Sequence, residues 1–151
     1  MDNIFEIEVT NKIIERINQL TNSSKAKWGT MSVSQALAHC NVTYQMIYDT
    51  DKQQPVTGFK KFILKLLVKP IVVGEKPYKN NGRTAPEFII SSEKDFEKEK
   101  TSLVSNIKKT QELGSSHFEG KESNSFGALT ASQWNNMFVK HLDHHLKQFG
   151  V

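Results

Sequence analysis

Two short capping motifs constrain the fold of this chain more than any other feature. The stretches SVSQ (32–35) and TASQ (130–133) each place a hydroxyl three residues before a glutamine. In this arrangement the hydroxyl accepts a hydrogen bond from the backbone N–H of the glutamine, whose side chain reaches back to the start of the helix. Apolar residues at intervals of three and four follow both motifs, as on one face of a helix. The sequence therefore predicts helices over about 32–49 and 130–149.

Two further helices are predicted from other signals. Apolar residues at helical spacing predict one over about 10–20. The other begins near Ser92, where acidic Glu93 and Asp95 suit the N-terminal end of a helix dipole, and it ends near Gly114. Four helices with one long middle connection are typical of an all-α four-helix bundle, with the crossover wrapped over one end or side.

The connecting segments show little regular pattern. One exception is a short amphipathic helix at 59–69, which we expect to end at Pro70. The others are a polar connector at 50–58, an irregular crossover at 74–90, a Gly/Ser-containing loop at 114–127, and short isolated strand signals at 69–73 and 87–90. A chain of 151 residues is near the usual size of one domain, so we expect a single domain over 1–151.

Cysteine content and hydropathy predict the compartment. The chain has one cysteine, Cys40, which fits a reducing environment and lies on an apolar helix face, where we expect it to be a core residue. The N-terminus lacks the apolar run of a secretory signal. The most apolar stretch, 59–74, is interrupted by lysines and is too short to span a bilayer. We therefore expect a soluble, cytoplasmic protein.

The net charge of +4 is unevenly distributed, because residues 59–83 carry seven basic residues and one acid. Such a segment could lie on an anionic membrane surface, contact nucleic-acid phosphates, or use its apolar side as a homodimer face. It has no recognisable nucleic-acid motif, so the sequence favours a solvated helix face. We expect a small-molecule substrate as the partner, with no nucleic acid and no membrane, and a homodimer stays open.

Three of the five histidines fall within the C-terminal stretch KHLDHHLKQFG (140–150). His141 and His145 are four residues apart and project from the same side of the predicted helix, in the middle of its apolar stripe. His144 lies at the margin of that stripe. A buried imidazole without hydrogen-bond partners costs roughly 1–3 kcal/mol. A divalent metal would satisfy both interior rings, because each neutral imidazole can donate a nitrogen lone pair to one ion.

The other capped helix offers a third candidate ligand, His39, on the flank of its apolar stripe. If the two helices pack side by side, His39 could face His141 and His145 and leave coordination positions open for water or substrate. Nitrogens that converge to about 3–4 Å would support this site. Gln35, His144 and Gln148 are candidates for groups that hold the ligands in place, and no catalytic residue is identified. The alternative is that the histidines only make hydrogen bonds.

The same residues resemble a known family. KWGTMSVSQALAHC (27–40) and FGALTASQWNNMFVKHLDHHLKQFG (126–150) are similar to the DinB/YfiT-like superfamily of metalloenzymes, and to an uncharacterised branch of it in particular. The resemblance implies a four-helix bundle with up-down-down-up connectivity and a metal site at His39, His141 and His145. It implies nickel, zinc or iron as the metal.

The resemblance also bears on activity. It implies a metal-dependent enzyme, either a transferase that uses a low-molecular-weight thiol or a hydrolase. The alternative is a non-enzymatic helical bundle that binds a ligand or a protein partner through histidines that hold no metal. The metal, the substrate and the oligomeric state are not determined by the sequence, because three imidazoles suit several transition metals equally.

Overall fold

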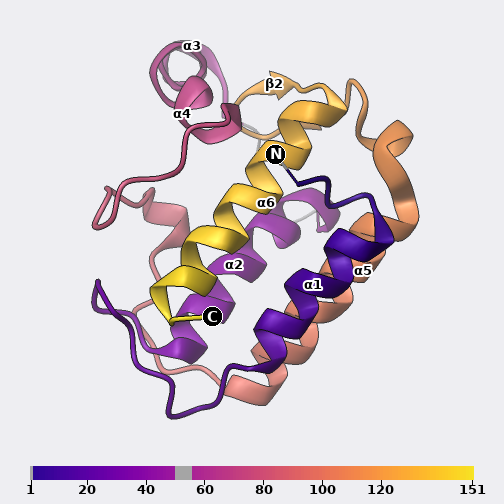
Figure 1. The fold of residues 1–151 in the computed structure, drawn as a ribbon. Coiled ribbons are helices and arrows are strands. Elements are labelled where there is room, and N and C mark those ends of the chain that lie inside the picture. Colours follow the sequence, from indigo (N-terminus) through magenta and orange to yellow (C-terminus); the bar gives the residue numbers. More distant parts are fainter. Residues whose placement is uncertain (1, 50–55) are drawn as a thin grey trace.

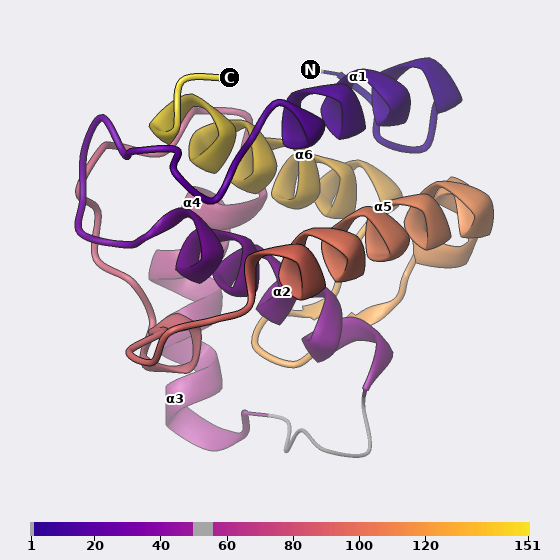
Figure 2. The ribbon, with the colours of Figure 1, turned by 90° about the horizontal axis from the view of Figure 1, so that it is seen from below.

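Most of the chain is helical in the computed structural model, which describes residues 2–49 and 56–151 (Figure 1). Four long helices make up the body of the described part: α1 (Ile7–Asn18), α2 (Val33–Tyr48), α5 (Phe96–Phe118) and α6 (Ala131–Gln148). Helices α1 and α2 both pack against α5 and α6, and α5 packs against α6. In Figure 2, α1 and α6 lie above α2 and α5. The prediction of an all-α fold is confirmed at this level.

Both predicted capping boxes are present. The hydroxyl of Ser32 accepts from the backbone N–H of Gln35, and the side chain of Gln35 accepts from the backbone N–H of Ser32. Thr130 and Gln133 repeat this arrangement at the start of α6. These boxes satisfy N–H groups that the first turn of a helix would otherwise leave unpaired, which explains why the two helix starts were predicted to within a residue.

Helix α5 differs from the prediction at both ends. It begins at Phe96 and not near Ser92, because the carboxylate of Asp95 caps the helix by accepting from the backbone N–H of Lys98 at 2.9 Å. Gly114 has a φ of +72° and breaks the regular helical path, as predicted, but helical structure resumes and reaches Phe118. The prediction that the helix ends at Gly114 is therefore only partly right.

The segment predicted as a loop at 114–127 contains regular structure. After the end of α5, strands β1 (Glu122–Ser123) and β2 (Gly127–Ala128) form a small antiparallel hairpin, with Ser123 opposite Gly127. The hydroxyl of Ser123 accepts from the backbone N–H of Phe126 across the turn. Two paired residues on each strand give too short an alternation to be seen in a sequence.

The connection between α2 and α5 also departs from the prediction. Helical structure runs from α3 (Gly58–Ile63) through the π-helical segment η2 (Leu64–Val68) into α4 (Lys69–Val73), and so passes Pro70. Pro70 lacks an N–H and its ring would clash with a carbonyl one turn earlier in an α-helix, and the wider π turns directly before it relieve this conflict. The isolated strand signals at 69–73 and 87–90 form no strand: the first segment is α4, and the second overlaps a 3₁₀ turn, η3 (Pro86–Phe88). Of the polar connector predicted at 50–58, residues 50–55 lie outside the described residues.

An aromatic cluster fills the core between the long helices. The rings of Tyr44 and Phe138 stack with centroids 5.3 Å apart, and Phe118 and Trp134 contact Phe138 at 5.5 and 5.8 Å. Cys40 is also buried, as predicted, and burial raises the pKa of its thiol to about 12. This packing fixes α2 and α6 relative to each other. No helix among the described residues has the length and apolar character needed to cross a bilayer.

Candidate metal centre

Helices α2 and α6 bring three histidines together. One ring nitrogen from each of His39, His141 and His145 lies within 4.8 Å of the others. The ring centroids are 4.6 Å apart for His39 and His145, and 4.9 Å for the two pairs that include His141. His39 is 5 % exposed, and the two α6 rings are partly exposed. The cluster is therefore compatible with a metal site.

The cluster is wider than a metal-bound triad. Nitrogens that each lie ~2 Å from one ion are at most about 4 Å apart, and the sequence-based expectation was 3–4 Å. The 4.8 Å limit observed exceeds this by about 1 Å. Binding of an ion would therefore require the imidazole rings to move toward one another, which changes in side-chain torsion angles allow.

Each of the three rings already has a hydrogen-bond partner at Nδ1. His39 Nδ1 lies 2.8 Å from the backbone carbonyl oxygen of Phe88, and His145 Nδ1 lies 2.8 Å from Oε1 of Gln148. His141 Nδ1 lies 3.1 Å from the hydroxyl oxygen of Thr43. A metal-binding histidine commonly donates its other ring N–H to such a group, which fixes the orientation of the ring.

These partners determine where the protons are. A carbonyl oxygen can only accept, so Nδ1 of His39 carries the proton and donates to Phe88. Nε2 of Gln148 donates to the backbone oxygen of Trp28 at 2.7 Å, which turns Oε1 of the same amide toward His145 as an acceptor. Nδ1 of His145 is therefore also protonated. In both rings the lone pair is left on Nε2, the nitrogen available to a metal.

Electrostatics keep the rings in the form that binds a metal. Burial is the main cause that lowers the pKa of His39, and burial lowers the pKa of His141 strongly, with repulsion from His145 and His39 adding to the effect. The pKa of His145 falls to about 3, first through burial and then through repulsion from His39. All three imidazoles are therefore neutral near pH 7 and can donate a lone pair.

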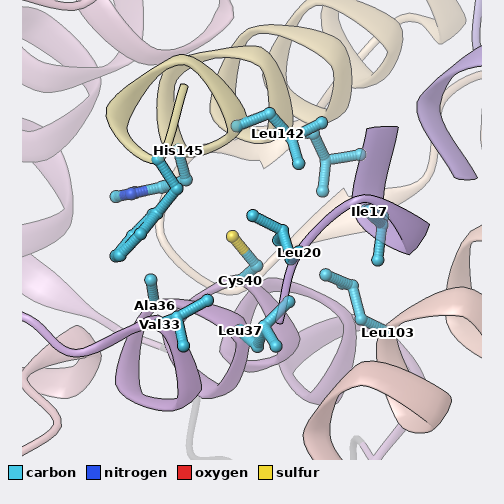
Figure 3. A pocket seen from close by; sticks show the side chains of 11 residues that line it. Ile17, Leu20, Val33, Ala36, Leu37, Cys40, Leu103, Leu142 and His145 are labelled. Carbon is cyan, nitrogen blue, oxygen red and sulfur yellow. The ribbon is translucent and has the colours of Figure 1, made fainter. Parts of the chain in front are cut away.

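The surroundings of the cluster differ on its two sides. On the inner side, Leu142 and His145 of α6 face Leu37 and Cys40 of α2 across an apolar cavity of about 10 Å³ (Figure 3). This volume is at the lower limit for a single water, so the cavity has no room for a larger ligand. On the other side the crossover after α4 covers the cluster, with the ring of Phe88 5.4 Å from that of His39.

Gln148 occupies the position predicted for a residue that supports the ligands, and it is almost fully buried. Besides His145, it contacts the loop before α2: its Nε2 bonds the oxygen of Trp28, and its backbone oxygen accepts from the N–H of Lys27. An ideal Cβ on Gly29, where φ is +78°, would lie 2.7 Å from that same Nε2. The loop therefore holds the amide in one orientation, and the amide holds His145.

Replacing Gln148 with leucine is expected to weaken metal binding about 10- to 100-fold, because Nδ1 of His145 then loses its acceptor. The dissociation constant for zinc, measured by competition with a chromophoric chelator, checks this. Gln35→Ala is the matched control, since Gln35 bonds Ser32 and the oxygen of Ser92 and belongs to the cap of α2. An equal loss of affinity in both variants would show that helix stability, and not the orientation of His145, sets the affinity.

Replacing Gly29 with alanine is expected to weaken zinc binding without altering any ligand, because the added Cβ displaces the Gln148 amide. The positive φ also strains an alanine by about 1 kcal/mol. Gly120→Ala separates the two effects: Gly120 has a φ of +72°, but a Cβ there meets no atom within 4 Å. We expect both variants to unfold at lower denaturant concentration and only Gly29→Ala to lose zinc affinity. Unchanged affinity in Gly29→Ala would refute the proposed contact.

The remaining predicted residues lie elsewhere. Gln35 belongs to the cap of α2, as described above. His144 is partly exposed and lies between the rings of Trp28 and Tyr78, with centroids at 5.7 and 5.8 Å, beside a surface groove of about 440 Å³. Its ring is 5.0 Å from that of His145 but is not one of the three clustered ligands. The neighbouring Asp143 is half-buried and pairs with Arg16 of α1 at 3.1 Å.

Two contributors to the site were missed by the sequence analysis. Thr43 lies one turn after His39 on the same side of α2, and this spacing could have identified it. Phe88 acts through its backbone oxygen, and a carbonyl carries no side-chain signal in a sequence. Only the fold shows that the crossover returns to the site.

The residues present fit a divalent transition metal. Three neutral imidazoles with their second nitrogens engaged are the donor set of open zinc and related sites, which keep at least one position for water or substrate. At such a position a bound water or thiol would lose its proton more readily than in solution. The site therefore has the chemistry needed to activate a small nucleophile.

Comparisons with known proteins give one match. Neither the curated proteins nor the solved structures contain a match to this chain. A family model described as "Protein of unknown function (DUF1569)" matches residues 3–150. The match covers both helices that carry the histidine cluster, and the chain belongs to this family of unknown function.

Proposed function

We propose that this protein binds one divalent transition metal through His39, His141 and His145 and uses it to transform a small molecule. The observation that carries the proposal is the set of three clustered imidazoles, each held at Nδ1 by its own partner. The acceptors at Nδ1 of His39 and His145 leave Nε2 of both rings free to bind a metal. Nickel, zinc and iron all suit this donor set.

The fold supports the same proposal. The order of the long helices and the long connection between α2 and α5 fit a DinB-like four-helix bundle with up-down-down-up connectivity. In such a bundle, one ligand comes from the second long helix and two come from the last. His39 on α2 and the pair on α6 have this distribution.

The proposed reaction class rests on the number of ligands, because three imidazoles would leave at least one position on the metal for another ligand. A bound metal would supply a thiolate or hydroxide near neutral pH, so we propose S-transfer from a low-molecular-weight thiol, or hydrolysis. Phe88 and Gln148 would keep two of the metal's ligands in place, because they accept hydrogen bonds from Nδ1 of His39 and of His145, respectively. The crossover containing Phe88 limits access of solvent to one side of the cluster.

Cobalt substitution tests the open position and the thiol together. Metal-free protein titrated with Co²⁺ should show visible absorption that saturates at one equivalent. Addition of 2-mercaptoethanol should then produce a near-ultraviolet sulfur-to-cobalt charge-transfer band. Saturation without any change on adding the thiol would refute S-transfer and leave hydrolysis, to be assayed with activated esters. Failure to bind cobalt, nickel or zinc would favour a ligand-binding or interaction module without metal.

A further inference from the structure

A second feature, unrelated to the histidine cluster, is an exposed apolar stripe on the segment Gly58–Val73, here called the basic arm. It comprises α3, η2 and α4 and projects from the side of the packed helices in Figure 2. Its large apolar side chains with more than half of their surface exposed are Phe59 (78 %), Phe62 (59 %), Leu66 (59 %), Leu67 (59 %) and Ile71 (62 %). Single exposed apolar residues are ordinary on protein surfaces, but a concentration of them on one segment marks a binding surface.

The π-helical turns align these side chains. In a π-helix the hydrogen-bond repeat is five residues, so residues five apart lie near one another along the same face. Phe62 and Leu67 are five apart, and so are Leu66 and Ile71. The same π segment, Leu64–Val68, thus accommodates Pro70 and gathers the apolar residues into one stripe.

The opposite side of the basic arm is fixed to the body of the protein. Val73 is buried, and Leu64, Val68 and Val72 pack partly buried against the core. Two side chains of α6 hold the end of the arm: Lys140 donates to the backbone oxygens of Ile71, at 2.6 Å, and Gly74, and Asn136 donates to that of Val73 at 3.0 Å. The arm is therefore packed against the body of the protein, and the exposed stripe is its outer face.

Positive charge accompanies the stripe. The arm contains Lys60, Lys61, Lys65 and Lys69 and no acidic residue. The one ion pair that the arm makes within the described residues joins Lys60 to Glu87 at 3.7 Å, and both side chains are largely exposed, so it is weak. A basic helix with bulky apolar residues on its exposed side matches the interfacial helices of proteins that lie on membranes.

Charge decides between the candidate occupants of the stripe. A solvated helix face, favoured by the sequence, accounts for the lysines but leaves Phe59, Phe62, Leu66, Leu67 and Ile71 unexplained. A symmetric homodimer through the stripe would set the lysines of one copy against those of the other, at an electrostatic cost. We propose that the basic arm binds the surface of anionic lipid bilayers, with its apolar stripe inserted at the headgroup level and its lysines contacting lipid phosphates or carboxylates.

Vesicle co-sedimentation of the full chain tests the proposal. We expect the protein to sediment with vesicles of equal parts phosphatidylcholine and phosphatidylserine, to release as salt is raised, and not to bind pure phosphatidylcholine. Phe62→Ser combined with Leu66→Ser should weaken binding about tenfold or more, because two large apolar side chains no longer enter the interface. Ile7→Ser is the matched control, since Ile7 is 55 % exposed but lies on α1.

Lysine variants complete the test. Lys60→Gln with Lys61→Gln should also weaken binding about tenfold, and Lys12→Gln with Lys108→Gln, both exposed on other helices, should not. No sedimentation of the wild-type chain with anionic vesicles at low salt would overturn the proposal. The proposal would also be overturned if the lysine variant abolished binding while the Phe62/Leu66 variant left it intact. Binding would then depend on charge alone, and the arm would attract any polyanion, including nucleic acid. A dimer lost in the Phe62/Leu66 variant, without vesicle binding, would assign the stripe to a second copy of the chain.

Discussion

His141→Ala is expected to reduce bound zinc or nickel from about one equivalent to less than a tenth at micromolar free metal. His141 is one of the three clustered rings, with its centroid 4.9 Å from those of His39 and His145. Two imidazoles alone leave an ion with too few protein ligands for tight binding. Equilibrium dialysis against nickel or zinc, followed by elemental analysis, measures the effect.

The control for this variant is His117→Ala. His117 is exposed at the end of α5, away from the cluster, and should leave the stoichiometry unchanged. Thermal unfolding gives a second readout. Metal at 100 times its dissociation constant should raise the free energy of unfolding of the wild-type chain by about 2.7 kcal/mol. The same metal concentration should not stabilise His141→Ala. Full metal stoichiometry in His141→Ala would show that the ion binds elsewhere.

The metal-free protein is expected to lose stability steeply as the pH falls from 7 to 5. His145 has a pKa of about 3 in the folded chain, lowered by burial and by His39. In the unfolded chain its pKa returns to about 6.5, so in this range only the unfolded state takes up the proton and acid favours unfolding. His145 alone should lower the free energy of unfolding by about 2 kcal/mol between pH 7 and 5. His39 and His141, whose pKa values are also lowered, add losses of the same sign.

Urea unfolding of EDTA-treated protein at the two pH values measures this loss. His145→Leu should reduce the difference between pH 7 and 5 by about 2 kcal/mol, because the variant has no imidazole to protonate. If His145→Leu shows the same pH dependence as the wild-type chain, His145 is not held neutral by its surroundings.

Much of the fold could be predicted from local chemistry. The two capping boxes determined the starts of α2 and α6, because Gln35 and Gln133 satisfy N–H groups that only a helix start leaves free. The prediction that the helix of the arm ends at Pro70 was wrong. A proline ordinarily ends a helix, and the π segment that accommodates this one has no sequence signature. The sequence favoured a solvated helix face there for a related reason: periodicity shows that a helix has an apolar face, but not whether that face is covered.

For the candidate site, helical spacing predicted which histidines would lie close together but not which backbone groups would contact them. His141 and His145 had to share a face because they are four residues apart, and His39 followed from a second helix packed beside the first. The same reasoning named Gln148 as a candidate for a group that holds the ligands in place. The carbonyl of Phe88 was not, because it depends on the path of a crossover without regular structure.

The central claim is that His39, His141 and His145 share one ion. Elemental analysis of untagged protein, as purified and after incubation with nickel or zinc and removal of the excess, tests this most directly. The account predicts about one equivalent of a single divalent transition metal per chain. Less than a tenth of an equivalent, unchanged by added nickel or zinc, would contradict it.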